Sequence, residues 1–338
     1  MIVIFLVSSY LGAIMHKIRI GIVGYGNVGR GAEKAVLAAP DMELRGVFTR
    51  RDVSSLRLSD SSVPVLSVQR AQDMTREIDV MLLCGGSATD LAEQGPHFAS
   101  MFNIVDSYDT HAKIPGYLAS IDAVAKRTTA VISTGWDPGL FSMMRVMAES
   151  ILPDGLCYTF WGRGVSQGHS DALRRIEGVK NAVQYTIPVE SAIERVRSGE
   201  RPEFETRQKH TRECFVVAEP GADKIALEEA IKGMPHYFVD YDTIVNFIDD
   251  EELKVRHSRM PHGGMVLHSG RTGENEHVVE FSLKLDSNPE FTGSVIAAYA
   301  RAAFRLSAEG SFGAKTVYDV PLSYISPKSR DDLISELL

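Results

Sequence analysis

Hydrophobic residues in the first part of the chain, up to residue 140, fall into short unbroken runs with helical segments between them. Unbroken apolar runs are typical of strands that are buried on both faces of a sheet. The predicted strands cover residues 17–24, 42–49, 78–86, 102–109 and 129–139. A helix is expected over 27–39, stopped by Pro40. This alternation predicts βαβ units and an α/β fold with a doubly wound parallel sheet.

The pattern changes after about residue 150, where strand-like segments alternate between polar and apolar positions. The alternating segments cover residues 157–162, 180–189, 213–219, 263–270 and 277–286. Alternation predicts a largely antiparallel sheet with one solvated face, in a second domain of α+β type. A helix is expected over 222–234, and a long alanine-rich helix over 289–310 that packs back on the first domain.

These patterns predict a discontinuous domain organisation. The parallel-sheet domain is expected over 15–135 plus 289–338, and the α+β domain over 136–288. Residues 1–14 are apolar, too few to span a bilayer, and without the basic start of a secretory signal. We interpret them as an extension upstream of a natural start at Met15. A weak membrane anchor is the alternative.

Composition narrows the functional classes. The hydrophobic fraction of 44% and charged fraction of 24% are those of a globular protein, and the net charge of −8 disfavours nonspecific attraction to nucleic acid or anionic membrane. The cysteines Cys84, Cys157 and Cys214 are far apart and form no CxxC pair. No metal site or disulfide framework is predicted, and a reducing, cytoplasmic setting is expected.

A glycine-rich turn joins the first strand to the first helix. Gly24, Gly26 and Gly29 match G-x-G-x-x-G, in which the glycines permit a tight turn, approach of a pyrophosphate and close helix packing. The amino end of the following helix favours phosphate. The motif, with its intervening residues, therefore predicts a dinucleotide site in a Rossmann-like domain, the alternative being a glycine turn without a ligand. The intervening residues are Tyr25, Asn27 and Val28.

The residues at the end of the second strand indicate which dinucleotide is expected. Thr49 is followed there by Arg50 and Arg51, where an NAD site has an acidic residue that bonds the ribose 2′-hydroxyl. A guanidinium matches a 2′-phosphate instead, so we predict NADP(H). The alternative is that the arginines are solvated loop charges. A later strand ends on Cys84, Gly85 and Ser87, predicted to line the nicotinamide ribose, or else to be small turn residues.

Two carboxylates follow strand ends on the edge of the sheet where ligands bind. Asp109 lies in "DSYDTH" and Asp137 in "STGWDPG". Paired carboxylates beside a nicotinamide could bind an ammonium group or act as acid and base. Each could equally be a helix N-cap, which is common for aspartate after a strand. The spacing alone leaves both readings open.

Longer motifs resemble one enzyme family. The segments "FWGRGVSQGHSDALRRIEGVKNAVQYT" (160–186) and "MPHGG" (260–264) are the most particular. Together with "GYGNVGR", "GSATD", "STGWDPG", "KHTRECFVV" and "LDSNP", they closely resemble the meso-diaminopimelate dehydrogenases. The resemblance runs from about residue 18 to the C-terminal region, and residues 1–14 lie outside it.

The resemblance implies an activity and an assembly. The family deaminates the D-configured centre of meso-2,6-diaminopimelate oxidatively with NADP⁺, giving L-2-amino-6-oxopimelate, ammonia and NADPH. The reverse reaction supplies lysine and the cross-linking amino acid of cell walls. The family forms homodimers through its substrate domain.

The resemblance also implies roles for single residues. Asp109 and Asp137 match the groups near the reacting amine, and the matching substrate-binding residues are Trp136, Trp161, Gln167, Gly168, Thr186, Arg212, His262 and Asn288. Without the resemblance, structural roles are favoured: core aromatics for Trp136 and Trp161, and a surface charge, a strand threonine and a histidine in a glycine turn for Arg212, Thr186 and His262. Two other functions stay open: an NADP-dependent reductase of a keto or semialdehyde compound, similar to homoserine dehydrogenase, and a noncatalytic NADPH-sensing module.

Overall fold

The computed structural model describes residues 17–338, so the predicted N-terminal extension over residues 1–14 lies outside the described residues. The chain forms two compact units, and the division falls after Pro138 and again after Phe291. Thr292–Leu338 belongs with the first unit. Both domain boundaries lie three residues later in the structure than expected from sequence, at 138 instead of 135 and at 291 instead of 288. Trp136 and Asp137 therefore belong to the first unit.

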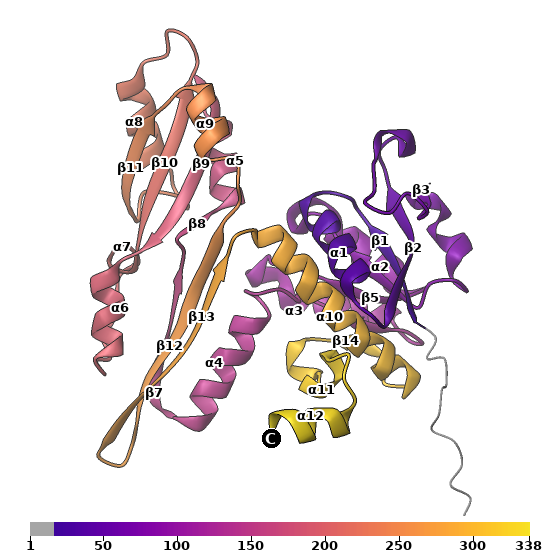
Figure 1. The fold of residues 1–338 in the computed structure, drawn as a ribbon. Helices are drawn as coiled ribbons and strands as arrows, with labels where there is room; N and C mark the ends of the chain where they lie inside the picture. The colour runs from indigo at the N-terminus through magenta and orange to yellow at the C-terminus, as the bar shows by residue number, and fades with distance from the viewer. Residues whose placement is uncertain (1–16) are drawn as a thin grey trace, which may run out of the picture. The chain divides into compact units, whose positions relative to one another are not determined.

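The first unit contains a seven-stranded sheet in which all neighbouring strands pair in parallel (Figure 1). The order β3-β2-β1-β4-β5-β6-β14 places β1 and β4 at the topological switch point, as in a Rossmann fold. The strands are β1 (Ile18–Val23), β2 (Met42–Thr49), β3 (Val65–Ser67), β4 (Val80–Leu83), β5 (Asn103–Asp106), β6 (Thr129–Val131) and β14 (Gly313–Lys315).

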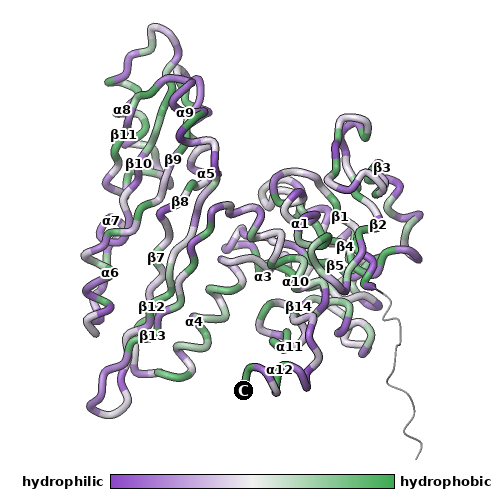
Figure 2. The backbone as a smooth tube through the Cα atoms, viewed as in Figure 1, coloured by the Kyte–Doolittle hydropathy of each residue, from purple (hydrophilic) through white to green (hydrophobic). Residues whose placement is uncertain are grey.

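Hydrophobic strand residues explain why this sheet is central. All four residues of β4 are buried, and Figure 2 marks the middle strands as hydrophobic. The helices that cover the sheet are α1 (Asn27–Ala38), α2 (Ala92–Ala99), α3 (Ile114–Val124) and α10 (Asn288–Ala308). The short α11 (Leu322–Ile325) and α12 (Arg330–Leu337) end the chain. Gly293 of α10 packs on α1 so closely that a Cβ would lie 2.3 Å from the Ala32 nitrogen.

The second unit contains two smaller sheets. One has the order β11-β10-β9-β8 and the other the order β13-β12-β7. Their strands are β7 (Asp154–Trp161), β8 (Gly164–Val165), β9 (Val179–Pro188), β10 (His210–Ala218), β11 (Asp242–Phe247), β12 (His262–Thr272) and β13 (Asn275–Leu285). The helices are α4 (Leu140–Ile151), α5 (Gln167–Arg174), α6 (Glu190–Arg197), α7 (Thr206–Lys209), α8 (Lys224–Lys232) and α9 (Asp250–Arg256). Strands β12 and β13 form the long hairpin of Figure 1.

The fold class predicted from sequence is confirmed, with local differences. The strand expected over 129–139 ends at Val131. The chain turns there because the Ser133 backbone N–H and the Thr134 hydroxyl donate to Asp106. Strands β3 and β14 were not predicted because each is only three residues long. In the second unit β10 and β11 pair in parallel, within a unit whose other ladders are antiparallel.

Candidate active site

The glycine turn has the geometry of a phosphate cradle. Gly24 has φ of +88°, a conformation that favours glycine, and a Cβ on Gly29 would lie 2.2 Å from the Gly24 carbonyl oxygen. At Gly26 a Cβ would meet nothing within 4 Å. The turn therefore uses Gly24 and Gly29 to close on itself, whereas Gly26 leaves open space in front of the amino end of α1. That space fits a pyrophosphate.

The end of β2 is tied to this turn. The Arg51 guanidinium donates to the Tyr25 carbonyl oxygen at 2.5 Å, and the Arg51 backbone N–H donates to Thr49 Oγ1 at 3.0 Å. Tyr25 is buried and donates its hydroxyl to Glu33 at 2.6 Å. Burial and the Glu33 carboxylate raise the pKa of the Tyr25 hydroxyl. The backbone of the glycine turn therefore holds the Arg51 guanidinium in place.

Arg50 points to a different partner. Its guanidinium forms an ion pair with Asp90 Oδ1 at 2.6 Å. The other oxygen of Asp90 accepts the Gly86 backbone N–H at 3.1 Å, in the turn that follows β4. The pair therefore joins the ends of β2 and β4, on either side of β1. Cys84 at the same strand end is buried, which raises the pKa of its thiol to about 12.

A buried carboxylate connects the two loops that carry Asp109 and Asp137. Asp106 is 0% exposed, and its Oδ1 accepts the backbone N–H groups of Tyr108 at 3.0 Å and Ser133 at 2.9 Å. Its Oδ2 accepts the Tyr117 hydroxyl at 2.6 Å. Burial raises the pKa of the Asp106 carboxyl. Because one side chain holds both loops, the positions of Asp109 and Asp137 depend on each other.

The loop ends themselves are ordered by further contacts. The Asp109 backbone N–H donates to Ser87 Oγ at 3.1 Å, which joins the loop after β5 to the turn after β4. Asp137 precedes Pro138 through a cis peptide bond, and Trp136 is buried. Ser87 and Asp109, both predicted from sequence, are therefore in direct contact.

In the second unit, three strands bring predicted residues into one row. Arg212 of β10 lies opposite Thr186 of β9, and Thr186 lies opposite Gly164 of β8. A Cβ on Gly164 would lie 2.4 Å from Cγ of the His262 ring. Strand register therefore places Arg212, Thr186 and Gly164 in a row across the four-stranded sheet. Gly164 makes room there for the imidazole of His262, which lies at the start of β12 in the other sheet.

Arg212 is almost completely buried, at 6% exposed. Its guanidinium donates to Thr186 Oγ1 and stacks on the Tyr241 ring, 3.8 Å from the ring centroid. Burial lowers the pKa of the guanidinium. Its Nε is buried without a hydrogen-bond partner among residues 17–338. A buried guanidinium with unused donors is suited to a carboxylate ligand.

A buried amide lies on β9, the strand of Thr186. Gln184, two residues before Thr186 in β9, is 0% exposed, and neither its Oε1 nor its Nε2 has a partner within the described chain. Strand periodicity puts Gln184 and Thr186 on one face. An unpaired buried amide destabilises a fold, and such groups are concentrated at functional sites.

Two other predicted residues of this unit, Gln167 and Asn288, share Met260 as a neighbour. Gln167 Nε2 contacts Met260 Sδ at 3.3 Å, and the Asn288 backbone N–H donates to the Met260 carbonyl at 3.0 Å. The Val165 N–H donates to the Pro261 carbonyl at 2.9 Å. The start of α5, the start of β12 and the start of α10 therefore lie together. Gly168 follows Gln167 in α5, and a Cβ there would meet nothing within 4 Å.

Trp161 ends β7 and stacks on a histidine. The Trp161 backbone N–H donates to His210 Nε2 at 2.9 Å, and the two rings are stacked with centroids 5.4 Å apart. Burial, with Lys209 and Arg212 nearby, lowers the pKa of His210 to about 3. Burial also lowers the pKa of His262. Both histidines are therefore neutral at pH 7, and neutral imidazole both donates and accepts hydrogen bonds.

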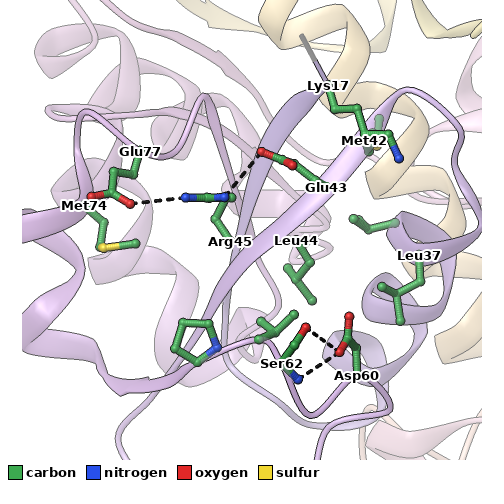
Figure 3. Close-up of a pocket in the computed structure, with 13 residues that line it drawn as sticks. Lys17, Leu37, Met42, Glu43, Leu44, Arg45, Asp60, Ser62, Met74 and Glu77 are labelled. Carbon is green, nitrogen blue, oxygen red and sulfur yellow. Dashed lines mark hydrogen bonds and ion pairs between the residues drawn. The ribbon is translucent and has the colours of Figure 1, made fainter.

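A cavity of about 480 Å³ in the first unit is separate from these groups (Figure 3). It is lined by the start of β2, where Arg45 pairs with Glu43 and Glu77. Ligands of doubly wound sheets bind beyond the carboxyl ends of the strands. Because Arg50 and Arg51 follow the carboxyl end of β2, the cavity lies at the wrong end of that strand for the dinucleotide. Within residues 17–338 there is no cluster of metal-ligating side chains.

Comparison with known proteins identifies the family. The family model "Diaminopimelic acid dehydrogenase C-terminal domain" matches residues 135–287. The chain is 61% identical to the meso-diaminopimelate D-dehydrogenase of Acetivibrio thermocellus over 332 residues, which are 97% of this chain and 99% of that protein. The chain belongs to the meso-diaminopimelate D-dehydrogenase family. The resemblance noted from sequence motifs is thereby confirmed.

Solved structures of this dehydrogenase family share the fold. The diaminopimelate dehydrogenase of C. glutamicum in complex with diaminopimelate has 47% identity and a TM-score of 0.89, covering 96% of this chain and all of that one. An engineered D-amino acid dehydrogenase bound to NADP⁺ has 46% identity and a TM-score of 0.84, covering 95% of this chain and all of that one.

Sequence reasoning missed three residues of the candidate dehydrogenase site. They are Asp106, Gln184 and Tyr241, and each is distinguished by burial or by a contact made across the fold. Asp106 is the first aspartate of the motif "DSYDTH", and the site was predicted at the second, Asp109. The pattern of apolar residues around Asp106 could have signalled a buried carboxylate, but no local signal marks Gln184 or Tyr241.

Proposed function

We propose that this chain catalyses the NADP⁺-dependent oxidative deamination of the D-centre of meso-2,6-diaminopimelate to L-2-amino-6-oxopimelate and ammonia. The row Arg212–Thr186–Gly164–His262 carries the proposal, because it offers a buried cation and neutral hydrogen-bonding groups side by side. Such a row suits the distal amino-acid head of a substrate with two ammonium and two carboxylate groups. Membership of the dehydrogenase family supports it.

The first unit contains the groups proposed to bind the cofactor. The open space at Gly26 and the amino end of α1 suit the pyrophosphate, and Arg50 and Arg51 suit the ribose 2′-phosphate. When bound, NADP⁺ supplies the acceptor for the hydride that leaves the D-centre carbon. The engineered relative bound to NADP⁺ supports this assignment.

Asp109 and Asp137 are proposed to hold the reacting amine. A carboxylate accepts hydrogen bonds from an ammonium group and can take its proton, which leaves the neutral amine needed before the carbon loses hydride. The resulting imine adds water, and ammonia leaves as the carbonyl forms. Asp106 keeps both loops in place, so the two carboxylates keep a set geometry during these steps.

The second unit is proposed to select the substrate and its configuration. Arg212 can grip the distal carboxylate bidentately, while Thr186, His262 and Asn288 add hydrogen bonds. Gln167, Gly168 and Trp161 are proposed to line the rest of the pocket in this unit. Trp136, a residue of the first unit, is likewise proposed to be a substrate-binding residue. Anchoring both ends of the molecule leaves one centre free to react, which accounts for selectivity between the D- and L-centres.

The test is an absorbance assay. Addition of meso-diaminopimelate and NADP⁺ to the protein should produce NADPH, whereas LL-diaminopimelate should produce none. DD-diaminopimelate and a simple D-amino acid complete the series and measure the contribution of the distal head. NADPH oxidation that depends on a keto acid but not on ammonia would favour a keto or semialdehyde reductase. Binding of NADPH with no turnover of any substrate would favour a sensing module.

Three further features belong to the same proposal. The first unit is proposed as the dinucleotide-binding domain and the second as the substrate-binding and dimerisation domain of a homodimer, which sedimentation can test. Reductive amination would supply lysine and cell-wall precursors. We place the enzyme in the cytoplasm, since Cys84, Cys157 and Cys214 are free thiols. No helix among the described residues is long and apolar enough to cross a membrane.

A further inference from the structure

We propose that Asp90 is a specificity-determining residue for the cofactor, because its carboxylate competes with the 2′-phosphate of NADP⁺ for Arg50. The inference rests on the proposed cofactor and goes beyond it, since it assigns a role to a residue outside the arginine pair. It begins from the ion pair between Arg50 and Asp90 Oδ1, at 2.6 Å.

The pair occupies the place where a phosphate recognition group is expected. Arg50 follows β2 directly, at the position that reads the ribose 2′ substituent in a Rossmann domain. Asp90 comes from the turn after β4, on the far side of β1. Arg50 and Asp90 both line a cavity of about 460 Å³, together with Thr89, Gln94 and Phe98. The Arg50 guanidinium and the Asp90 carboxylate therefore belong to residues that line the same cavity.

Folding stability does not account for this pair. The Arg50 side chain is 64% exposed, and exposed ion pairs contribute little to the free energy of unfolding. Asp90 is nevertheless held in place, because its second oxygen accepts the Gly86 N–H and its side chain is only 16% exposed. A carboxylate held in place next to an exposed guanidinium acts on whatever ligand the guanidinium binds.

Charge determines the direction of the effect. A 2′-phosphate that binds Arg50 arrives within a few ångströms of the Asp90 carboxylate, and the two anions repel each other. The carboxylate also offsets part of the positive charge that Arg50 presents to the phosphate. NAD⁺ has a neutral hydroxyl at this position and meets neither cost. Asp90 therefore weakens NADP⁺ binding selectively and moderates the cofactor preference that Arg50 and Arg51 create.

The experiment is direct calorimetric titration of the full-length protein with NADP⁺ and with NAD⁺. Asp90→Asn keeps the shape and an oxygen for Gly86 but removes the charge. We expect the Kd for NADP⁺ to fall about three- to tenfold and the Kd for NAD⁺ to change less than about twofold. In an Arg50→Ala background, Asp90→Asn should have a much smaller effect, since the competition is gone.

Glu93→Gln is the matched control. Glu93 lines the same cavity and carries the same charge, yet the ion pair of Arg50 is with Asp90. This variant should leave both Kd values within about twofold. An unchanged or higher Kd for NADP⁺ in Asp90→Asn overturns the inference, and so does an equal gain in Glu93→Gln. If the unaltered protein binds neither dinucleotide, the proposed cofactor fails first, and the titrations separate the two failures.

Discussion

Arg212 lies directly opposite Thr186 on neighbouring antiparallel strands, and its guanidinium donates to the threonine hydroxyl. Both side chains are buried, so the hydrogen bond orients the cation inside the second unit. The stack on Tyr241 restrains the guanidinium from a second side. A cation restrained in this way loses little further conformational freedom when it binds a carboxylate.

Arg212→Ala should therefore raise the KM for meso-diaminopimelate by about 10- to 100-fold, as expected for loss of a charged hydrogen-bonding group. The Kd for NADP⁺ should stay unchanged, because the residues proposed to bind it lie in the other unit. Steady-state kinetics and calorimetry measure the two quantities. Arg207→Ala, which removes an exposed arginine paired with Asp242, is the control. An unaltered KM in Arg212→Ala would remove the proposed role.

Gly26 and Gly29 should respond differently to alanine. Gly26→Ala should fold with nearly normal stability, because a Cβ there meets nothing within 4 Å, but it should bind NADP⁺ at least about tenfold more weakly, since the methyl group enters the phosphate space. Gly29→Ala should lower the free energy of unfolding by roughly 1–3 kcal/mol, because its Cβ would overlap the Gly24 carbonyl oxygen. Urea unfolding and calorimetry separate the two effects. Equal loss of stability in both variants would contradict this interpretation.

Asp106 should tolerate asparagine better than alanine. Its Oδ1 accepts both the Tyr108 and Ser133 N–H groups, and asparagine retains that oxygen. Alanine leaves these donors and the Tyr117 hydroxyl without their acceptor, which should cost roughly 3–5 kcal/mol in unfolding free energy and lower kcat as the loops of Asp109 and Asp137 separate. Denaturant unfolding and kcat for meso-diaminopimelate test this. A fully active Asp106→Ala variant would show that the loops hold their positions by other contacts.

Acid should destabilise the fold through His210. Its pKa of about 3 in the folded state lies below its ordinary value of 6.5, so the unfolded chain binds the proton more readily. Stability from this group is therefore complete above pH 6.5 and declines as the pH falls toward 3, by up to roughly 5 kcal/mol. His210→Gln should flatten the pH dependence of unfolding free energy in this window while lowering stability at pH 7. Parallel curves for the two proteins would refute the assignment.

Local patterns predicted most of the first unit. Its strands are unbroken apolar runs and its phosphate turn is defined by glycine spacing, because backbone conformation and burial on both faces act over a few residues. The two arginines after β2 were predicted as cofactor ligands for the same reason, since that prediction depends on their position relative to a strand end. The short strands β3 and β14 were not predicted, because three residues are too few to show a periodicity.

The sequence by itself therefore determined the fold class, the dinucleotide turn and, through motif resemblance, the dehydrogenase family. Only the tertiary structure decided which charges meet. Asp90 pairs with Arg50 from 40 residues away, and Arg212 reaches Thr186 across 26 residues. Strand order and register decide such pairings, and these depend on packing of the whole sheet. Burial likewise distinguishes Asp106 from Asp109, because the cost of removing a carboxylate from water depends on everything that surrounds it.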